Sequence, residues 1–476
     1  MILFLRHLIS IFLFALFCKM AVPGNAADPT KKEVVETIAK ATAYFTKHVE
    51  KHGGYVYFYS LDLSTRYGEG IAQPDQIWVQ APGTPYVGMA YLAAWEATRD
   101  PQYLKAVERV ALALVYGQLK SGGWTNSISF SPASGRTAAY RNGMGTGRNY
   151  STWDDGISQL AIRFLLKADV ALEHKHPKIN DSLNYALSAM LASQFPNGAF
   201  PQGWQGKVAE YPAKNATLPS ERWRTEGKIK NYWDLYTLND NLASQMFHTL
   251  NEVYQQTQDK KYLQAIQQLG NFLICAQLPA PQPAWAQQYN YEMVPVWARK
   301  FEPPAIAGSE SQDVIETLLR ISIVTQDKKY LEPFPKALKY LQSVELPDQL
   351  LARYYEFGTN KPLYFVRTGN LYELTYKDDQ LPSHYGWKTR SKLKNLQQLY
   401  EQCSAGKNPF LSSKRVTAMD AQKLIKNLDS QGRWVDVANG EQLVGQTKMA
   451  KGTVYLSSET FADNINKLAT YLKSID

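Results

Sequence analysis

The sequence contains few cysteine and histidine residues, and this scarcity excludes several kinds of site. Only three cysteines and seven histidines occur among its 476 residues. There is no HExxH zinc pattern, no Walker phosphate loop and no Ser/His/Asp set for nucleophilic catalysis. The cysteines do not form a zinc-binding pattern either. Any chemistry must therefore depend on other side chains.

Long apolar runs are also missing after the N-terminus. The run from Leu8 to Phe17 is shorter than the ~20 residues needed to span a bilayer. A positive charge precedes it, and small residues follow it at Gly24, Ala26 and Ala27. This pattern is typical of a secretory signal, and an uncleaved anchor or a lipid anchor at Cys18 fits less well. We expect residues 1–27 to be removed, leaving a secreted or periplasmic protein without membrane contact.

The charge balance is moderately basic. The full chain has a formal charge of +9, which falls to +7 when Arg6 and Lys19 leave with the signal. The basic residues are scattered, whereas nucleic-acid binding favours clusters. A modest excess of this kind fits an acidic partner. The two remaining cysteines, Cys275 and Cys403, are compatible with a disulfide or with buried free thiols.

Apolar-periodic segments rich in Ala, Leu and Tyr recur along the chain and predict helices in pairs. No Pro/Ser-rich linker divides them, so we expect one domain over residues 28–476, acting as a monomer. A repeat of helix pairs predicts stacked helical hairpins. The predicted helices lie at 28–52, 85–99, 101–119, 156–174, 179–193, 241–257, 260–276, 309–325, 328–344 and 458–474.

Two phrases repeat between these helices. One places Gln and Trp in short Gly- or Pro-rich loops, at 118–124, 194–204 and 277–285. The other opens helices at 258–263 and 326–331 with the same six residues, and a looser copy lies at 99–104. Loops that leave one end of the stack would form an aromatic surface for sugars, with Trp204 as a predicted substrate contact; core packing of these rings is the alternative. The unusually long loops 121–150 and 195–236 locate the predicted active face.

Acidic residues stand at two loop–helix junctions. Asp154 and Asp155 open one helix, and Asp240 opens another. Each junction taken alone favours helix capping, since acids stabilise the positive end of the helix dipole. Equivalent junctions of successive repeats would converge in a toroid, however, and carboxylates are ligands for Ca²⁺. We therefore predict one shared Ca²⁺ site formed by these three residues.

Three arginines are candidates for contact with an acidic ligand. Arg299 precedes a helix start, and its alternative is a surface salt bridge. Arg353 and Arg367 lie on the two arms of a predicted hairpin whose turn is at 358–362. They would face one carboxylated ligand, unless the hairpin is an ordinary surface element.

Several motifs together resemble the family-10 pectate lyases. They are Ala81-Pro-Gly-Thr-Pro85, Ser151-Thr-Trp-Asp-Asp-Gly156, Ile162-Arg-Phe-Leu165, Tyr236-Thr-Leu-Asn-Asp-Asn241, Trp297-Ala-Arg-Lys-Phe-Glu302, Gly308-Ser-Glu-Ser311, Tyr354-Tyr-Glu-Phe-Gly-Thr-Asn360 and Tyr385-Gly-Trp387. The resemblance runs from about Pro82 to Trp387. It implies an all-α fold, an incomplete (α/α) toroid of helical hairpins with long aromatic loops and a short β-hairpin.

The resemblance also implies roles for individual residues. Asp154, Asp155 and Asp240 would hold Ca²⁺, and Asp154 would also contact the substrate. Arg299 would be the catalytic base, with Arg353 and Arg367 binding substrate. The implied activity is calcium-dependent β-elimination of polygalacturonate. Two alternatives are a toroid glycoside hydrolase, in which Asp154 and Asp240 act as acid and base, and a non-catalytic protein that binds acidic glycans.

Overall fold

The computed structural model describes residues 28–131, 135, 137–226, 229–411, 415–441 and 448–475. The predicted signal peptide, with Cys18, lies outside these residues. Within them, no helix is both long enough and apolar enough to cross a membrane. Cys275 is half-buried and Cys403 is buried, and both thiols are free, so the disulfide alternative does not hold.

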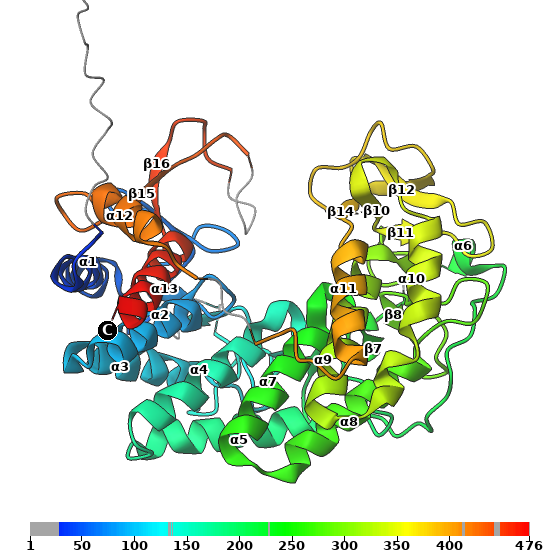
Figure 1. Cartoon of the computed structure of the whole chain (residues 1–476), viewed down its shortest axis with the longest axis horizontal. Helices are drawn as coiled ribbons and strands as arrows, with labels where there is room; N and C mark the ends of the chain where they lie inside the picture. The colour runs from blue at the N-terminus through cyan, green and yellow to red at the C-terminus, as the bar shows by residue number, and fades with distance from the viewer. Residues whose placement is uncertain are drawn as a thin grey trace, which may run out of the picture.

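Paired helices follow one another around an open arc (Figure 1). The first helices of the pairs pack against each other in succession. They are α2 (Thr84–Thr98), α4 (Ile157–Ala171), α7 (Leu242–Thr257) and α9 (Gly308–Thr325). Their partners are α3 (Pro101–Gly117), α5 (Pro177–Ala192), α8 (Lys260–Cys275) and α10 (Phe334–Ser343). This confirms the predicted incomplete (α/α) toroid.

The two ends of the chain complete a further unit of the arc. The N-terminal helix α1 (Lys31–Tyr44), which continues as a π-helix over Phe45–Val49, packs against the C-terminal helix α13 (Ser458–Ile475). Strand β1 (Phe58–Ser60) pairs with β16 (Val454–Ser457), which lies between β1 and β15 (Val435–Val437). α13 also packs on α2. Segments far apart in sequence therefore form one arm of the molecule together with α12 (Ala418–Asn427).

A short strand precedes each helical hairpin and another follows it. Their pairing fixes the end of the helical stack from which the loops between hairpins emerge. The strand before each pair of helices bonds antiparallel to a strand after it. The pairs are β3 (Gln76–Trp78) with β4 (Ser127–Ser129), β5 (Ser151–Thr152) with β6 (Gly203–Trp204), β7 (Tyr236–Thr237) with β8 (Gln288–Tyr289), and β9 (Ile306–Ala307) with β11 (Tyr354–Tyr355). Equivalent segments of successive repeats thus meet at the same end of the stack.

The repeated helix-opening phrase forms the turn between the two helices of a pair. Its first residue adopts a left-handed conformation, and the next residue is an aspartate that caps the second helix. Asp100, Asp259 and Asp327 accept hydrogen bonds from backbone N–H groups two residues on, at 2.9, 3.1 and 3.0 Å. This repeat therefore has a structural role.

The repeated Gln/Trp phrase is structural as well. Each Gln amide donates to a carbonyl of its own loop and to one of the next hairpin: Gln118 to Gly122 and Ser182, Gln194 to Gly198 and Ala265, Gln277 to Pro283 and Pro333. Trp124 and Trp285 are fully buried, and their indole N–H groups donate to helix carbonyls. The expected sugar-facing surface is thus wrong for these two rings, and core packing is the correct alternative.

The opposite arm of the molecule, which contains α10, carries most of the remaining strands. The predicted hairpin is observed as β11 with β12 (Pro362–Thr368), and β13 (Leu371–Thr375) extends it. Strand β10 (Leu350–Ala352) pairs with β14 (Lys388–Arg390), and α11 (Leu393–Ser404) follows. The predicted helix 328–344 is divided into a 3₁₀ turn, Lys328–Leu331, and α10 because prolines interrupt it.

Candidate active site

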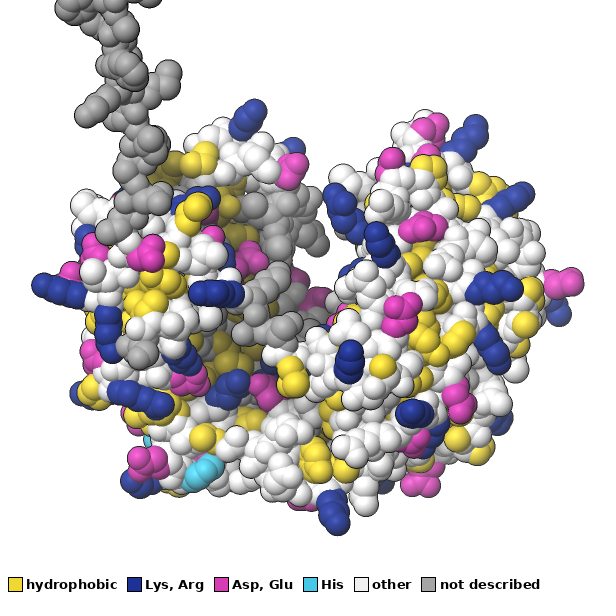
Figure 2. Space-filling model, in the orientation of Figure 1, with side chains coloured by type: hydrophobic (Ala, Val, Ile, Leu, Met, Phe, Trp, Pro, Cys, Tyr) yellow, Lys and Arg dark blue, Asp and Glu magenta, His cyan; other side chains and the backbone are white. Residues whose placement is uncertain are grey.

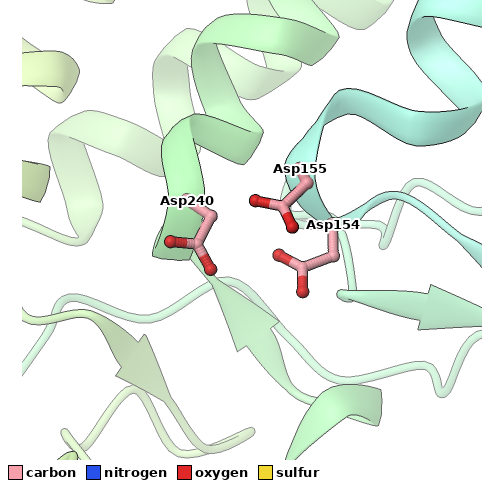
Figure 3. Close-up of side chains that lie close together, drawn as sticks. All are labelled: Asp154, Asp155 and Asp240. Carbon is pink, nitrogen blue, oxygen red and sulfur yellow. The ribbon is translucent and has the colours of Figure 1, made fainter. Parts of the chain in front are cut away.

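Three carboxylates converge where two successive helices begin (Figure 3). Asp154 and Asp155 stand just before α4, and Asp240 stands just before α7. One carboxylate oxygen of each lies within 4.8 Å of the others. Acidic side chains are visible at the base of the hollow between the two arms (Figure 2). The sequence-predicted acids are therefore brought together by the repeat of the fold.

An unusual backbone turn presents these acids. Two consecutive residues are left-handed before each helix: Asp155 and Gly156 with φ of 50° and 67°, and Asp240 and Asn241 with φ of 49° and 59°. Asp, Asn and Gly tolerate this region best. Neither helix has a side-chain cap at this end. The capping alternative is therefore wrong here, and the three carboxylates lie close to one another instead.

Side-chain amides hold the three carboxylates in place. Gln202 donates to Asp154 at 2.6 Å, Gln80 donates to Asp155 at 2.8 Å, and Asn239 donates to Asp240 at 2.5 Å. Neutral donors orient a carboxylate without cancelling its charge, which is how outer partners support metal ligands. The second oxygen of Asp154, Oδ1, is buried and accepts no hydrogen bond from the described residues.

The electrostatics of this cluster are unfavourable without a cation. Burial, followed by the charges of Asp240 and Asp155, raises the pKa of Asp154 well above its usual value. Burial, Asp240 and Glu69 raise the pKa of Asp155 to about 6. Like charges at this separation disfavour simultaneous ionisation. A cation bound among the oxygens would remove this penalty.

Arg299 lies near enough to the acidic cluster for its charge to lower the pKa of both Asp154 and Asp155. Its side chain is 40% exposed, and its Nη2 donates to Glu302 at 2.5 Å. Burial would lower the pKa of Arg299, but the hydrogen bond and charge of Glu302 outweigh burial and raise it. The alternative predicted for Arg299, a surface salt bridge, is only partly correct. The ion pair with Glu302 is present, but Glu302 is buried.

Tyr385 lies between Arg299 and a second arginine, Arg353. Its ring centroid is 5.5 Å from the Arg299 guanidinium and 4.9 Å from that of Arg353. Its hydroxyl donates to Glu302 at 3.0 Å and lies 2.8 Å from the hydroxyl of Tyr354. Tyr354 in turn donates to the buried Gln287. The Tyr385 hydroxyl is thus connected to the partly exposed Arg299 through Glu302, while the Tyr354 hydroxyl beside it is bonded to Gln287 in the core.

Arg353 is held deeper in the site. Its Nη2 lies 2.7 Å from Glu310 and 3.7 Å from Asp240, and it donates to Asn239 at 3.1 Å. Burial raises the pKa of Glu310 to about 7, even though the Arg353 charge opposes the shift. Glu310 belongs to the first turn of α9. The third helix start of the series therefore also directs an acid toward this region, where an arginine pairs with it.

Two other predicted substrate residues lie outside this cluster. Arg367 is exposed on β12, where its Nε donates to the Gly369 carbonyl at 2.8 Å. Among the described residues no contact joins Arg367 to Arg353. Trp204 is 7% exposed. It is not the equivalent of Trp124, because the carbonyl that accepts from the next strand belongs to Trp124 in the first loop and to Phe200 in this one. Their roles in substrate binding remain predictions.

Sequence reasoning did not single out several residues of the site. Gln80, Gln202 and Tyr385 come from separate segments, and only the fold brings them to the acids or the arginines. Gln80 carries no sequence signal. Tyr385 and Glu310 lay in motifs that support the family resemblance, so those motifs were the available signal.

With this geometry in view, the chain can be compared with known proteins. Residues 118–346 match the family model for pectic acid lyase. The chain is a relative of the pectic acid lyases. As a pectic acid lyase-like protein it is a polysaccharide lyase. The matched segment contains the three acids and Arg299, whereas Arg353, Arg367 and Tyr385 follow it. None of the curated proteins matches this pectic acid lyase-like chain.

Solved structures share its general architecture. A variant of the family 10 polysaccharide lyase from Cellvibrio cellulosa, in complex with trigalacturonic acid, is 16% identical with a TM-score of 0.45, covering 66% of this chain and 98% of that one. A D-mannose isomerase is 14% identical with a TM-score of 0.47, covering 94% and 98%. The α-1,6-mannanase of Salegentibacter sp. HEL1_6 is 11% identical with a TM-score of 0.41, covering 93% and 99%.

Proposed function

We propose that this polysaccharide lyase cleaves polygalacturonate by calcium-dependent β-elimination. The observation that carries the proposal is the group of three carboxylates held within 4.8 Å by neutral amides and faced by Arg299. The trigalacturonic acid in the complex of the Cellvibrio enzyme supports an acidic substrate. The N-terminal pattern supports a secreted or periplasmic location, where such a polymer would be met.

The residues present fit a calcium ion. Asp154, Asp155 and Asp240 would hold it, because Ca²⁺ prefers oxygen ligands and accepts irregular geometry. The unpartnered Oδ1 of Asp154 is a free ligand atom, and the raised pKa of Asp154 shows that its negative charge lacks compensation. When bound, Ca²⁺ would neutralise the uronate carboxylate and so make the neighbouring C5 proton more acidic.

Arg299 is the proposed base that removes this proton. A guanidinium must first lose a proton, and its reference pKa of ~12.5–13.8 makes this costly. Glu302 and Asp240 raise the pKa of Arg299. Neutralising Asp240 would remove one of these influences. We therefore expect activity to require a site loaded with cation and to rise toward alkaline pH.

Arg353, and more peripherally Arg367, are proposed to bind substrate carboxylates. Arg353 is already oriented by Glu310 and Asn239, so little side-chain entropy would be lost on binding. Asp154 is also proposed to contact the substrate, and Trp204 to support the cleft wall.

Ultraviolet absorbance tests this function directly. The chain is incubated with polygalacturonate and Ca²⁺, and an unsaturated product gives rising absorbance that a chelator abolishes. Reducing ends without absorbance would indicate a hydrolase using Asp154 and Asp240. Binding with neither signal would indicate a non-catalytic glycan-binding protein. Either result would refute the proposed elimination.

A further inference from the structure

Arg148 differs from Arg299 and Arg353 because the described residues offer it no carboxylate partner. Arg299, Arg353 and Arg224 each pair with a glutamate. Arg148 is exposed and instead lies over aromatic rings, with its guanidinium carbon 4.5 Å from the ring centroid of Tyr150 and 5.6 Å from that of Trp233. Aromatic faces attract and orient a guanidinium while leaving its N–H donors available.

The rings beneath Arg148 are themselves fixed. The Tyr150 hydroxyl donates to Asp234 at 2.9 Å. Its ring lies so close to Gly203 that a Cβ there would be 1.8 Å from a ring carbon. Trp233 packs edge-to-face with Tyr232 at 5.2 Å. The cation is therefore held on a rigid base and not on a free surface loop.

This base adjoins the acidic cluster. The backbone N–H of Gln202 donates to the Trp233 carbonyl at 3.0 Å, and the side chain of the same Gln202 donates to Asp154 at 2.6 Å. Tyr150 directly precedes β5, four residues before Asp154. Only one residue therefore separates the aromatic base from the candidate metal ligands.

We infer that Arg148, supported by Tyr150 and Trp233, binds the carboxylate of a uronate sugar next to the one held at the acidic cluster. This inference rests on the proposed function. A uronate offers a carboxylate for bidentate guanidinium hydrogen bonds and an apolar ring face for aromatic contact. Arg148 thus extends the cleft by one binding position on the Asp154 side.

The test compares Arg148→Ala with a matched control, Arg99→Ala. Arg99 also lies over a tryptophan ring, Trp95, at 4.6 Å, but it ends α2 at the turn between α2 and α3, away from the helix starts. Affinities for tri- and hexagalacturonate are measured by calorimetry with Ca²⁺ present, with every protein also carrying Arg299→Lys so that cleavage does not consume the oligomers. We expect Arg148→Ala to weaken hexagalacturonate binding about ten-fold, trigalacturonate much less, and Arg99→Ala to change neither.

The outcomes separate this inference from the proposed function. Equal hexagalacturonate affinities with and without Arg148→Ala would overturn the additional position, even if lyase activity is found. Equal losses for short and long oligomers would also overturn it, because Arg148 would then serve the central position. A wild type that binds without cleavage would refute elimination, while the length-dependent loss would still support Arg148. A wild type that binds neither oligomer would overturn both.

Discussion

The two ends of the helical hairpins use the same repeat for different purposes. At the turn inside each hairpin, Asp100, Asp259 and Asp327 cap helices. At the starts of α4 and α7, Asp155 and Asp240 cap nothing and converge with Asp154. The backbone conformation of the acid itself decides the outcome, since it is extended at the three caps and left-handed at Asp155 and Asp240. An acid at a helix start therefore indicates a cap or a functional site only when its backbone conformation is known.

The largest effect is expected when an acid of the site, Asp240, is replaced. Asp240→Ala should lower Ca²⁺-dependent turnover about 1,000-fold, equivalent to ~4 kcal/mol of transition-state stabilisation. Stability should stay equal or increase, because one of three mutually repelling carboxylates is removed. Initial rates and thermal unfolding measure the two effects. The control Asp327→Ala removes a capping aspartate and should cost ~1 kcal/mol of stability without loss of turnover. The opposite pattern would show that Asp240 is structural.

Arg299→Lys should have the next largest effect. Lysine keeps the charge but changes reach and geometry, so turnover should fall about 100-fold, or ~3 kcal/mol. Substrate affinity should change little, because Arg353 remains in place. Steady-state kinetics over a pH series measure this. A lysine variant with the wild-type rate and pH profile would exclude Arg299 as the base.

Most of the scaffold was predictable from sequence because it follows local patterns. Apolar periodicity predicted α2, α3, α7, α8 and α13 to within two or three residues of each end. The convergence of the acids was predictable from the repeat. The pairing of β1 with β16 was not, since nearly four hundred residues separate the strands. Gln80 likewise shows no sign in the sequence of its hydrogen bond to Asp155, which depends on tertiary packing.

The loop aromatics show where sequence reasoning fails. Tryptophan in a Gly-rich loop is compatible with a sugar platform and with a buried anchor. Trp124 is a buried anchor because its N–H reaches the Leu114 carbonyl within the preceding helix. Only the geometry of the loop separates these alternatives. Arg299 presents the same difficulty, since its partner Glu302 was visible in the sequence but its burial was not.

A third helix start offers a pH test of the comparison. Glu310 in α9 is buried, and its pKa is raised from 4.5 to about 7. When folding raises the pKa of a carboxyl, the free energy of unfolding of the protein falls as the pH rises from the pKa of the unfolded state to that of the folded state. Wild type should therefore lose roughly 3 kcal/mol relative to Glu310→Gln between pH 4.5 and 7. Urea unfolding at both pH values measures this, and parallel stabilities would contradict it.

The glutamine loops should respond through stability alone. Gln118 is buried and its amide donates to two carbonyls, so Gln118→Ala removes a hydrogen bond from each of them. This should cost about 2 kcal/mol of unfolding free energy with turnover per folded molecule unchanged. Gln256→Ala, on the exposed side of α7, is the control and should stay within ±0.5 kcal/mol. Lost turnover in a fully folded Gln118→Ala protein would place this loop in the active site.

The smallest effect concerns Tyr385, and a closely matched residue makes it measurable. Tyr385 donates to the buried Glu302, which pairs with Arg299. Tyr376 donates to the buried Glu356 at 2.9 Å, and Glu356 pairs with Arg224. The two triads have the same chemistry, but only Arg299 faces the acids. If Tyr385 positions Arg299, Tyr385→Phe should lower kcat about ten-fold, or ~1.4 kcal/mol, with KM unchanged.

Tyr376→Phe should leave both kinetic constants within two-fold of wild type, since its triad lies outside the acidic cluster. Steady-state kinetics on polygalacturonate compare the two variants, and thermal unfolding shows whether each loses similar stability. Equal kcat values in the two variants would mean that the hydroxyl of Tyr385 only supports the fold. A change confined to Tyr385→Phe, at matched stability, would show that the Tyr385 hydroxyl orients Arg299 through Glu302.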